Sequence, residues 1–270
     1  MNLNTITEVK RPKSFEDIQW RDGHAFLAGG TWLFSEPQVG TDTLVDLEQF
    51  GWPPLTATPS GLEIAATCKI VELHDFKGPP EWRAVPLIDQ CIDCFLMSFK
   101  IWNAATVGGN VVMSLPAGAM ISLTAALEGV CTLWPLTGKP REVPVVDFVT
   151  GMHSNVLQKG ELLRSIFLPA SALSKRFAMR QASLTHLGRS AALIVATVED
   201  NDFDFLLTIS AATPRPVHIR FRKTPSASEL RQAIDERLPS DAWFNDVHGS
   251  ATYKRHVTLY LAEQIRAELS

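Results

Sequence analysis

Residues 26–33, FLAGGTWL, place two adjacent glycines, Gly29 and Gly30, directly after a short apolar run. The run predicts a β-strand, and the glycines predict the turn that ends it. Glycine adopts positive φ and has no Cβ, so that a ligand or another backbone segment can approach closely. A second pair, Gly108 and Gly109, occurs in residues 104–112, AATVGGNVV, between β-branched residues. We expect this pair also to lie where a strand gives way to a turn.

The two glycine pairs raise the question of a bound anion. Consecutive backbone N–H groups in such turns form a concave nest for an anion, usually a phosphate. A flanking threonine and asparagine favour a ligand with a diphosphate and hydroxyl groups. Gly-Gly also occurs in purely structural turns, so the residues alone leave both interpretations open. Neither G-x-G-x-x-G nor G-x-x-x-x-G-K-[ST] occurs in the chain. A Rossmann site and a P-loop are therefore both disfavoured.

Outward from residues 26–33, the chain divides into three regions. The first, residues 1–54, reads as a small βαβ-type subdomain with a short helix near residue 15 and strands near residues 26 and 44. It ends at GWPPLTATPSG, which is rich in proline and glycine. The second, residues 55–169, reads as a mixed α+β subdomain. Its AGAMISLTAALEGV stretch predicts a buried helix with Pro116 in the first turn.

The third region, residues 170–270, predicts a three-stranded antiparallel sheet with helices. A hairpin through Asn201 and Asp202 joins the last two strands. Ser226 and Glu229 form a capping-box pattern at the start of one helix, and a final amphipathic helix ends the chain. The basic run RFRKTP near residue 222 reads as a solvated patch. The fold class is therefore α+β.

Composition excludes several classes of function. The 270 residues are 46% hydrophobic and 20% charged with a net charge of −4, as in a soluble globular protein. Interspersed acids and bases argue against a nucleic-acid partner. No apolar run approaches the roughly 20 residues of a membrane helix, and the N-terminus lacks the apolar core of a signal peptide. We therefore expect no membrane partner and a cytoplasmic location.

No catalytic or metal site is predicted on this chain. Cys91 and Cys94 form a lone C-x-x-C without two further soft ligands nearby, and we interpret them as structural thiols. The histidines show no ligand spacing. Ser190 follows a glycine, but G-x-S-x-G is absent, which disfavours a hydrolase.

The order and spacing of these motifs resemble the FAD-binding medium subunit of the xanthine dehydrogenase and carbon monoxide dehydrogenase family of molybdenum hydroxylases. LAGGTWL followed by NAATVGGNVVMSLPAGAM is similar to that family's A-G-G-T/H and R-N-x-G-T-I-G-G-N with a downstream S-P-A-A-D. RPKSFEDI, GELLRSIFLP, RFAMRQASLTHLGRSAALIVA and DVHGSATYKRHV extend the resemblance over most of the chain. It implies a PCMH-type FAD-binding fold followed by a CO dehydrogenase flavoprotein-like C-terminal domain.

The resemblance also implies which residues hold FAD. One strand-turn would wrap the pyrophosphate, a second would cradle its other side and the ribityl chain, and three further positions would line or reach the cofactor. In that order, these residues are Ala28, Gly29, Gly30, Thr31, Trp32 and Leu33; Thr106, Val107, Gly108, Gly109 and Asn110; and Leu96, Leu163 and Arg180.

Three positions depart from the family pattern. Ala119 replaces an acidic residue, Trp102 replaces an arginine, and Trp32 replaces a small polar or acidic residue. Losing one to three charge-assisted hydrogen bonds, at about 1.5–3 kcal/mol each, would weaken binding by orders of magnitude. We expect both indoles inside the site, where each would either stack on a ring of the ligand or fill the space itself.

The function implied is that of one subunit in three. A large molybdopterin subunit would oxidise the substrate, a small [2Fe-2S] subunit would relay electrons, and FAD on this chain would pass them to NAD+ or another acceptor. Two alternatives stay open: a degenerate scaffold or assembly subunit without flavin, and a free-standing FAD-binding module.

Overall fold

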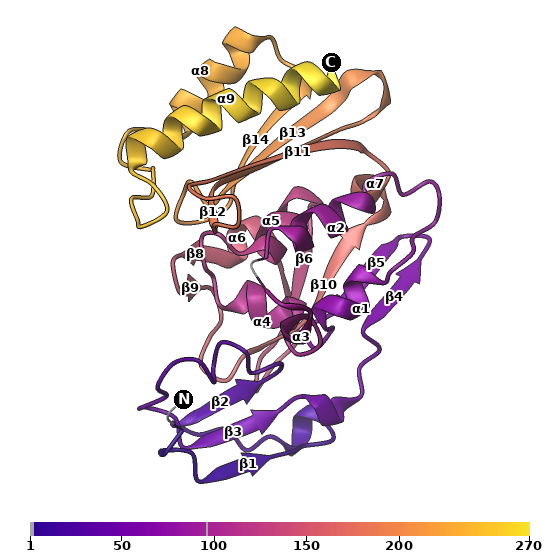
Figure 1. Cartoon of the computed structure of the whole chain (residues 1–270). Helices are drawn as coiled ribbons and strands as arrows, with labels where there is room; N and C mark the ends of the chain where they lie inside the picture. The colour runs from indigo at the N-terminus through magenta and orange to yellow at the C-terminus, as the bar shows by residue number, and fades with distance from the viewer. Residues whose placement is uncertain (1–2, 96) are drawn as a thin grey trace.

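Three β-sheets succeed one another along the chain and from bottom to top in Figure 1, which shows a computed structural model. The structure describes residues 3–95 and 97–270. The first sheet is parallel, with the order β1-β3-β2. Its strands are β1 (Glu8–Lys10), β2 (His24–Leu27) and β3 (Thr43–Asp46).

The first sheet confirms the predicted strands at residues 26 and 44 and adds one. Strand β1 escaped prediction because three residues are too short to show an alternating pattern. The expected helix near residue 15 is a single 3-10 turn, Phe15–Asp17. Strands β2 and β3 pair in parallel, as a βαβ-type unit requires, but consecutive turns replace the crossover helix.

The second sheet is antiparallel, with the order β4-β5-β10-β6-β7. Its strands are β4 (Leu55–Thr58), β5 (Gly61–Ala65), β6 (Val130–Trp134), β7 (Arg141–Pro144) and β10 (Leu162–Pro169). The helices of this part are α1 (Ile70–His74), α2 (Pro86–Asp93), α3 (Phe99–Trp102), α4 (Val107–Val112), α5 (Ala119–Ala126), α6 (Val145–Phe148) and α7 (Ala170–Leu173). A small hairpin consists of β8 (Val149–Gly151) and β9 (Ser154–Asn155).

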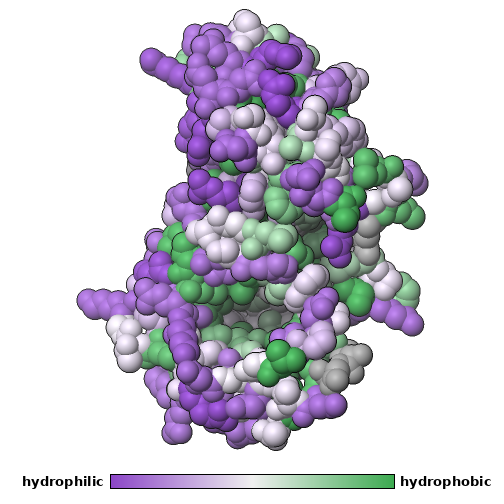
Figure 2. Space-filling view, turned by 90° about the vertical axis from the view of Figure 1, so that its left-hand side faces the viewer, coloured by the Kyte–Doolittle hydropathy of each residue, from purple (hydrophilic) through white to green (hydrophobic). Residues whose placement is uncertain are grey.

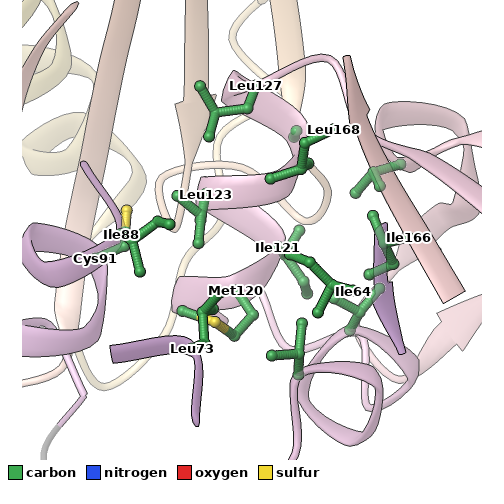
Figure 3. Close-up of a cluster of buried hydrophobic side chains, with 14 of the residues drawn as sticks. Ile64, Leu73, Ile88, Cys91, Met120, Ile121, Leu123, Leu127, Ile166 and Leu168 are labelled. Atoms are coloured by element: carbon green, nitrogen blue, oxygen red, sulfur yellow. The ribbon is translucent and has the colours of Figure 1, made fainter. Parts of the chain in front are cut away.

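Helix α5 is the centre of the core. All eight of its residues are buried, because it packs on α2, on α4 and on strands of the third sheet. Figure 3 shows Ile121 of this helix beside Ile64 of the second sheet, and Leu123 toward Ile88 of α2, within one cluster of apolar side chains. The predicted buried helix is therefore confirmed. Its first residue is Ala119, however, so Pro116 precedes the helix instead of lying in its first turn.

The third sheet has four antiparallel strands, where we predicted three. They are β11 (Arg176–Ser183), β12 (Ser190–Val198), β13 (Phe203–Ser210) and β14 (Val217–Lys223). The predicted basic patch begins in the second half of the fourth strand, where Arg222 and Lys223 are exposed, whereas Val217 and Ile219 in its first half are buried. Asn201 and Asp202 have positive φ and form the predicted turn between β12 and β13.

Two helices complete the third part. Helix α8 (Ala227–Arg237) has the predicted capping box of Ser226 and Glu229. Helix α9 (Ala251–Leu269) lies along β11 and β12 at the top of Figure 1 and buries one apolar face. No helix in residues 3–95 and 97–270 is long and apolar enough to cross a membrane. The division at residues 54 and 169 stays a prediction.

A cluster of charges joins the second sheet's layer to the third sheet. The ammonium of Lys175 is almost fully buried and donates to Glu128 at 2.7 Å and to Asp204 at 2.6 Å. Arg220 of β14 also contacts both carboxylates. Burial alone would raise the pKa of Glu128, but hydrogen bonds and attraction from Lys175 and Arg220 outweigh it, and this pKa is lowered.

The lowered pKa makes the contribution of Glu128 to stability depend on pH. A carboxyl group with a depressed folded-state pKa stabilises the fold above its unfolded pKa and stops doing so as the pH falls through the folded value. We expect Glu128→Gln to be less stable than the native chain at pH 7, by a difference that shrinks below about pH 4. Urea unfolding at both pH values measures it. Equal differences at both pH values would contradict the account, and Glu142→Gln, at an exposed site, is the control.

Candidate functional site

A cavity of about 620 Å³ opens between the first sheet, the helical layer and the C-terminal part of the chain. Figure 2 shows it as a hollow with a hydrophobic floor between the lowest part of the molecule and the layers above. Its volume lies in the range of sites for small molecules and cofactors, which are mostly apolar with a few polar groups. Its walls come from several stretches of chain that are distant in sequence.

The first wall is the glycine turn after β2. Residues 26–33 all line the cavity. A Cβ on Gly29 would overlap the backbone carbonyl of Ala104, so glycine is required for the two segments to touch. Gly30 has φ +69°, which is left-handed. Its carbonyl accepts a hydrogen bond from the N–H of Phe34 at 2.8 Å and closes the turn.

The turn presents a row of unused donors. The backbone N–H groups of residues 29–33 donate to no acceptor within residues 3–95 and 97–270. Five consecutive free N–H groups on a cavity wall are what an anion such as a pyrophosphate needs. These donors belong to the backbone, so they are present even though Trp32 replaces a polar side chain of the family pattern.

The second glycine pair has a different role from the expected one. Gly108 and Gly109 lie in the first turn of helix α4 and not at the end of a strand. The N–H of Gly108 donates to the carbonyl of Ala66 at 3.1 Å, and that of Gly109 donates to the Thr106 hydroxyl at 3.1 Å. A Cβ on Gly108 would lie 2.5 Å from the Cα of Ala66. The pair therefore permits close packing of a helix on β5, and its N–H groups are engaged within the protein.

Thr106, Gly109 and Asn110 nevertheless line the cavity opposite the first turn. The side-chain oxygen of Asn110 accepts a hydrogen bond from the N–H of Met120 at 3.1 Å, which fixes this wall to the start of α5. Val107 and Gly108 lie behind the wall, fully buried or nearly so.

Two other predicted residues lie away from the cavity. Leu163 is buried in the core on β10. Arg180 on β11 makes an ion pair with Glu268 of α9 and donates to a backbone carbonyl. Leu96 lies outside the described residues. The structure thus brings residues 28–33 together with Thr106, Gly109 and Asn110, and it does not bring Leu163 or Arg180 to them.

Of the three departures from the family pattern, one lies at the cavity. Trp32 lines it, and its ring lies 5.7 Å from that of His153. Trp102 was expected in the site, but it packs against His74 at 5.3 Å and does not contribute to the wall. Ala119 is buried in α5. The presence of Trp102 in place of the family's arginine therefore adds no indole to the cavity surface.

A third wall was missed by the sequence analysis. It consists of Arg189 and Ser190 at the start of β12 and of Phe244, Asp246, Val247 and His248 before α9. The ammonium of Lys254, fully buried in α9, contacts Asp246 at 2.9 Å and the carbonyl of Ala211 at 3.1 Å, which holds this loop in place. A fully buried lysine needs a charged partner, but the DVHGSATYKRHV stretch does not mark Lys254 as buried, so the sequence carries no signal for this wall.

The cysteines do not form a reactive or metal-binding centre in the described chain. Burial raises the pKa of Cys131 to about 12, and burial together with nearby acidic side chains raises those of Cys68 and Cys94 to about 12 and about 11. Thiols with such pKa values stay protonated, and the thiolate is the reactive form. Among residues 3–95 and 97–270, no three His, Cys, Asp or Glu side chains are placed to bind a metal ion.

A turn with free backbone N–H groups on the wall of an apolar cavity has the features of a cofactor site for a ligand with phosphates. The family described as "FAD binding domain in molybdopterin dehydrogenase" matches residues 7–171, and the chain belongs to this family. FAD is therefore its cofactor. The free N–H groups of residues 29–33, the glycines behind them and the size of the cavity fit the pyrophosphate and rings of that molecule.

Solved structures with the same fold extend the match beyond residue 171. A carbon monoxide dehydrogenase from Hydrogenophaga pseudoflava that lacks the Mo-pyranopterin moiety of its cofactor has 18% identity and a TM-score of 0.82, covering 98% of this chain and 97% of that one. Quinoline 2-oxidoreductase from Pseudomonas putida 86 has 16% identity and a TM-score of 0.77, covering 97% and 96%. Reconstituted CO dehydrogenase from Oligotropha carboxidovorans has 20% identity and a TM-score of 0.77, covering 96% of this chain and 97% of that one. A comparison with curated protein sequences finds no match.

The family membership confirms the resemblance inferred from the motifs, and the solved structures confirm the α+β fold class with its PCMH-type part. The correction to that fold class is the fourth strand of the C-terminal sheet. At these identities the likeness to solved structures concerns the fold. The individual cofactor contacts remain predictions. The cavity supports those at residues 28–33, Thr106, Gly109 and Asn110.

Proposed function

We propose that this chain is the FAD-carrying subunit of a molybdenum hydroxylase-type oxidoreductase. In such a complex it receives electrons from a small [2Fe-2S] subunit, whose own donor is a large molybdopterin subunit, and it delivers them to NAD+ or another acceptor. The observation that carries the proposal is the row of free N–H groups at residues 29–33 on the wall of an apolar cavity.

The chain's own contribution is binding, orientation and exclusion of water. FAD, when bound, supplies the electron-transfer chemistry. The turn at residues 29–33 would hold the pyrophosphate, and the apolar lining would bury the rings. No general acid or base is required of this chain, in agreement with the sequence analysis. A cytoplasmic location stays a prediction.

Exposed apolar side chains support a subunit over a free-standing module. Leu184 and Leu187 in the loop before β12, Met152 in the β8–β9 hairpin and Val247 before α9 are each more than half exposed. Large apolar side chains gathered on one part of a surface mark sites of protein contact. Met152 and Val247 also line the cavity, so a partner there would lie close to the cofactor.

The scaffold alternative has one observation in its favour. The N–H groups at the second glycine pair are engaged within the protein, so of the two glycine pairs the first alone offers free N–H groups to a pyrophosphate.

An absorption spectrum decides between the two functions. We expect the purified full chain, mixed with FAD and desalted, to retain a flavin band of about one equivalent. A colourless protein, both alone and after reconstitution with the molybdopterin and iron–sulfur subunits, would overturn the FAD proposal and favour the scaffold.

A further inference from the structure

The cavity wall carries an unbalanced positive charge. Among the described residues that line it, only Arg189 and Asp246 have an arginine, lysine or carboxylate side chain. Asp246 is already neutralised, because its carboxylate contacts the buried ammonium of Lys254 at 2.9 Å. Arg189 has neither a hydrogen bond nor an ion pair with any residue in the described ranges. The wall therefore presents one free guanidinium to whatever fills the cavity.

The backbone at Arg189 is fixed. The next residue, Ser190, is buried as the first residue of β12, and its hydroxyl accepts a hydrogen bond from Gln181 at 2.8 Å. Just before it, the N–H of Gly188 donates to the carbonyl of Thr185 at 2.9 Å and closes a turn. The backbone of Arg189 is thus held at the cavity from both sides, while its side chain is exposed.

The two arginines of β11 are engaged elsewhere. Arg176 pairs with Asp202 and Arg180 pairs with Glu268, and neither lines the cavity. The family resemblance implies Arg180 as the cofactor's basic contact. A free cation lies nine residues later in the chain, at Arg189, the last residue of the loop between β11 and β12.

We propose that Arg189 binds an anionic group of the FAD cofactor, the role that the sequence analysis gave to Arg180. The proposal rests on the proposed FAD function. A diphosphate carries two negative charges, and the N–H groups of residues 29–33 offer dipoles but no full charge. Burying an anion in an apolar cavity is costly unless a cation pairs with it. A guanidinium does so with two parallel hydrogen bonds, which a lysine cannot reproduce.

FAD has two groups that fit this chemistry: its pyrophosphate, and the isoalloxazine ring, which becomes anionic on reduction. The test compares the native chain with Arg189→Gln, Arg189→Lys and Arg231→Gln. Arg231 is exposed on α8 and does not line the cavity, so its replacement removes the same charge elsewhere. Each full-length chain is titrated with FAD and with riboflavin, which lacks the pyrophosphate, and the reduction potential of the bound FAD is measured.

We expect Arg189→Gln to lose about tenfold or more in FAD affinity, the size of one charge-assisted hydrogen bond. Arg189→Lys should recover part of the loss, and Arg231→Gln should bind as the native chain does. Unchanged riboflavin affinity assigns the contact to the pyrophosphate. Unchanged FAD affinity with a lower reduction potential assigns it to the reduced ring.

Arg189→Gln with native affinity and native potential, in a chain that binds FAD, overturns the assignment of Arg189 and leaves the FAD function standing. A native chain that binds no FAD overturns both.

Discussion

Gly29→Ala is expected to abolish retention of FAD by the purified chain and to lower its affinity by a factor of about one hundred or more. The added Cβ would overlap the carbonyl oxygen of Ala104, which is backbone and cannot rotate away. The turn would have to move from the neighbouring segment, and its N–H groups would no longer face the cavity together. A displacement of about 1 Å in a site of this kind is sufficient for such a loss.

Gly40→Ala is the matched control. Gly40 lies in the same part of the chain, and a Cβ there meets no atom within 4 Å. Fluorescence titration with FAD compares the two variants, and circular dichroism verifies that both are folded. Native FAD affinity in Gly29→Ala would contradict the role given to this turn.

Asp246→Asn is expected to destabilise the chain by about 3 kcal/mol. It leaves the fully buried ammonium of Lys254 without a counter-charge, with the Ala211 carbonyl and the new amide oxygen as neutral hydrogen-bond acceptors. Removing one partner of a buried ion pair costs about 3–5 kcal/mol, since the other charge stays without compensation. We place the expected value at the lower end because the Asp246 side chain is partly exposed.

The control is Asp235→Asn, which breaks the exposed pair between α8 and Arg255. Such surface pairs contribute at most about 1 kcal/mol. Urea unfolding of the three chains gives both differences. Stabilities of Asp246→Asn and Asp235→Asn that agree within error would contradict the view that Lys254 anchors the third wall. Asp246 lies in a loop that lines the cavity and that its ion pair with Lys254 holds in place. Because loss of the pair would loosen this wall, we expect the variant to bind FAD more weakly.

The first glycine turn could be predicted from sequence because its function lies in local backbone geometry. Gly29 and Gly30 follow strand β2, and the structure places them in the turn that the sequence predicts. The same two letters at residues 108 and 109 begin a helix, where glycine serves close packing on Ala66. Two adjacent glycines indicate that another group approaches the backbone closely, but they do not indicate whether that group is a ligand or a neighbouring chain segment.

The third wall could not be predicted, because it depends on contacts between distant segments. Arg189 and residues 244–248 meet only after β12 and α9 pack against each other. The resemblance to a known family supplied Arg180, whose guanidinium the fold directs to Glu268 instead. The fourth strand of the C-terminal sheet escaped prediction because three of its seven residues are basic and exposed, which masks the buried positions in its first half.

The central claim is that the backbone N–H groups of residues 29–33 bind the FAD pyrophosphate. Amide chemical shifts of the isotope-labelled full chain, followed during titration with FAD and then with riboflavin, test it most directly. We predict large shifts at residues 29–33 with FAD and small ones with riboflavin, while the engaged N–H of Gly108 changes little in both. FAD binding that leaves the amides of residues 29–33 unperturbed would contradict the account.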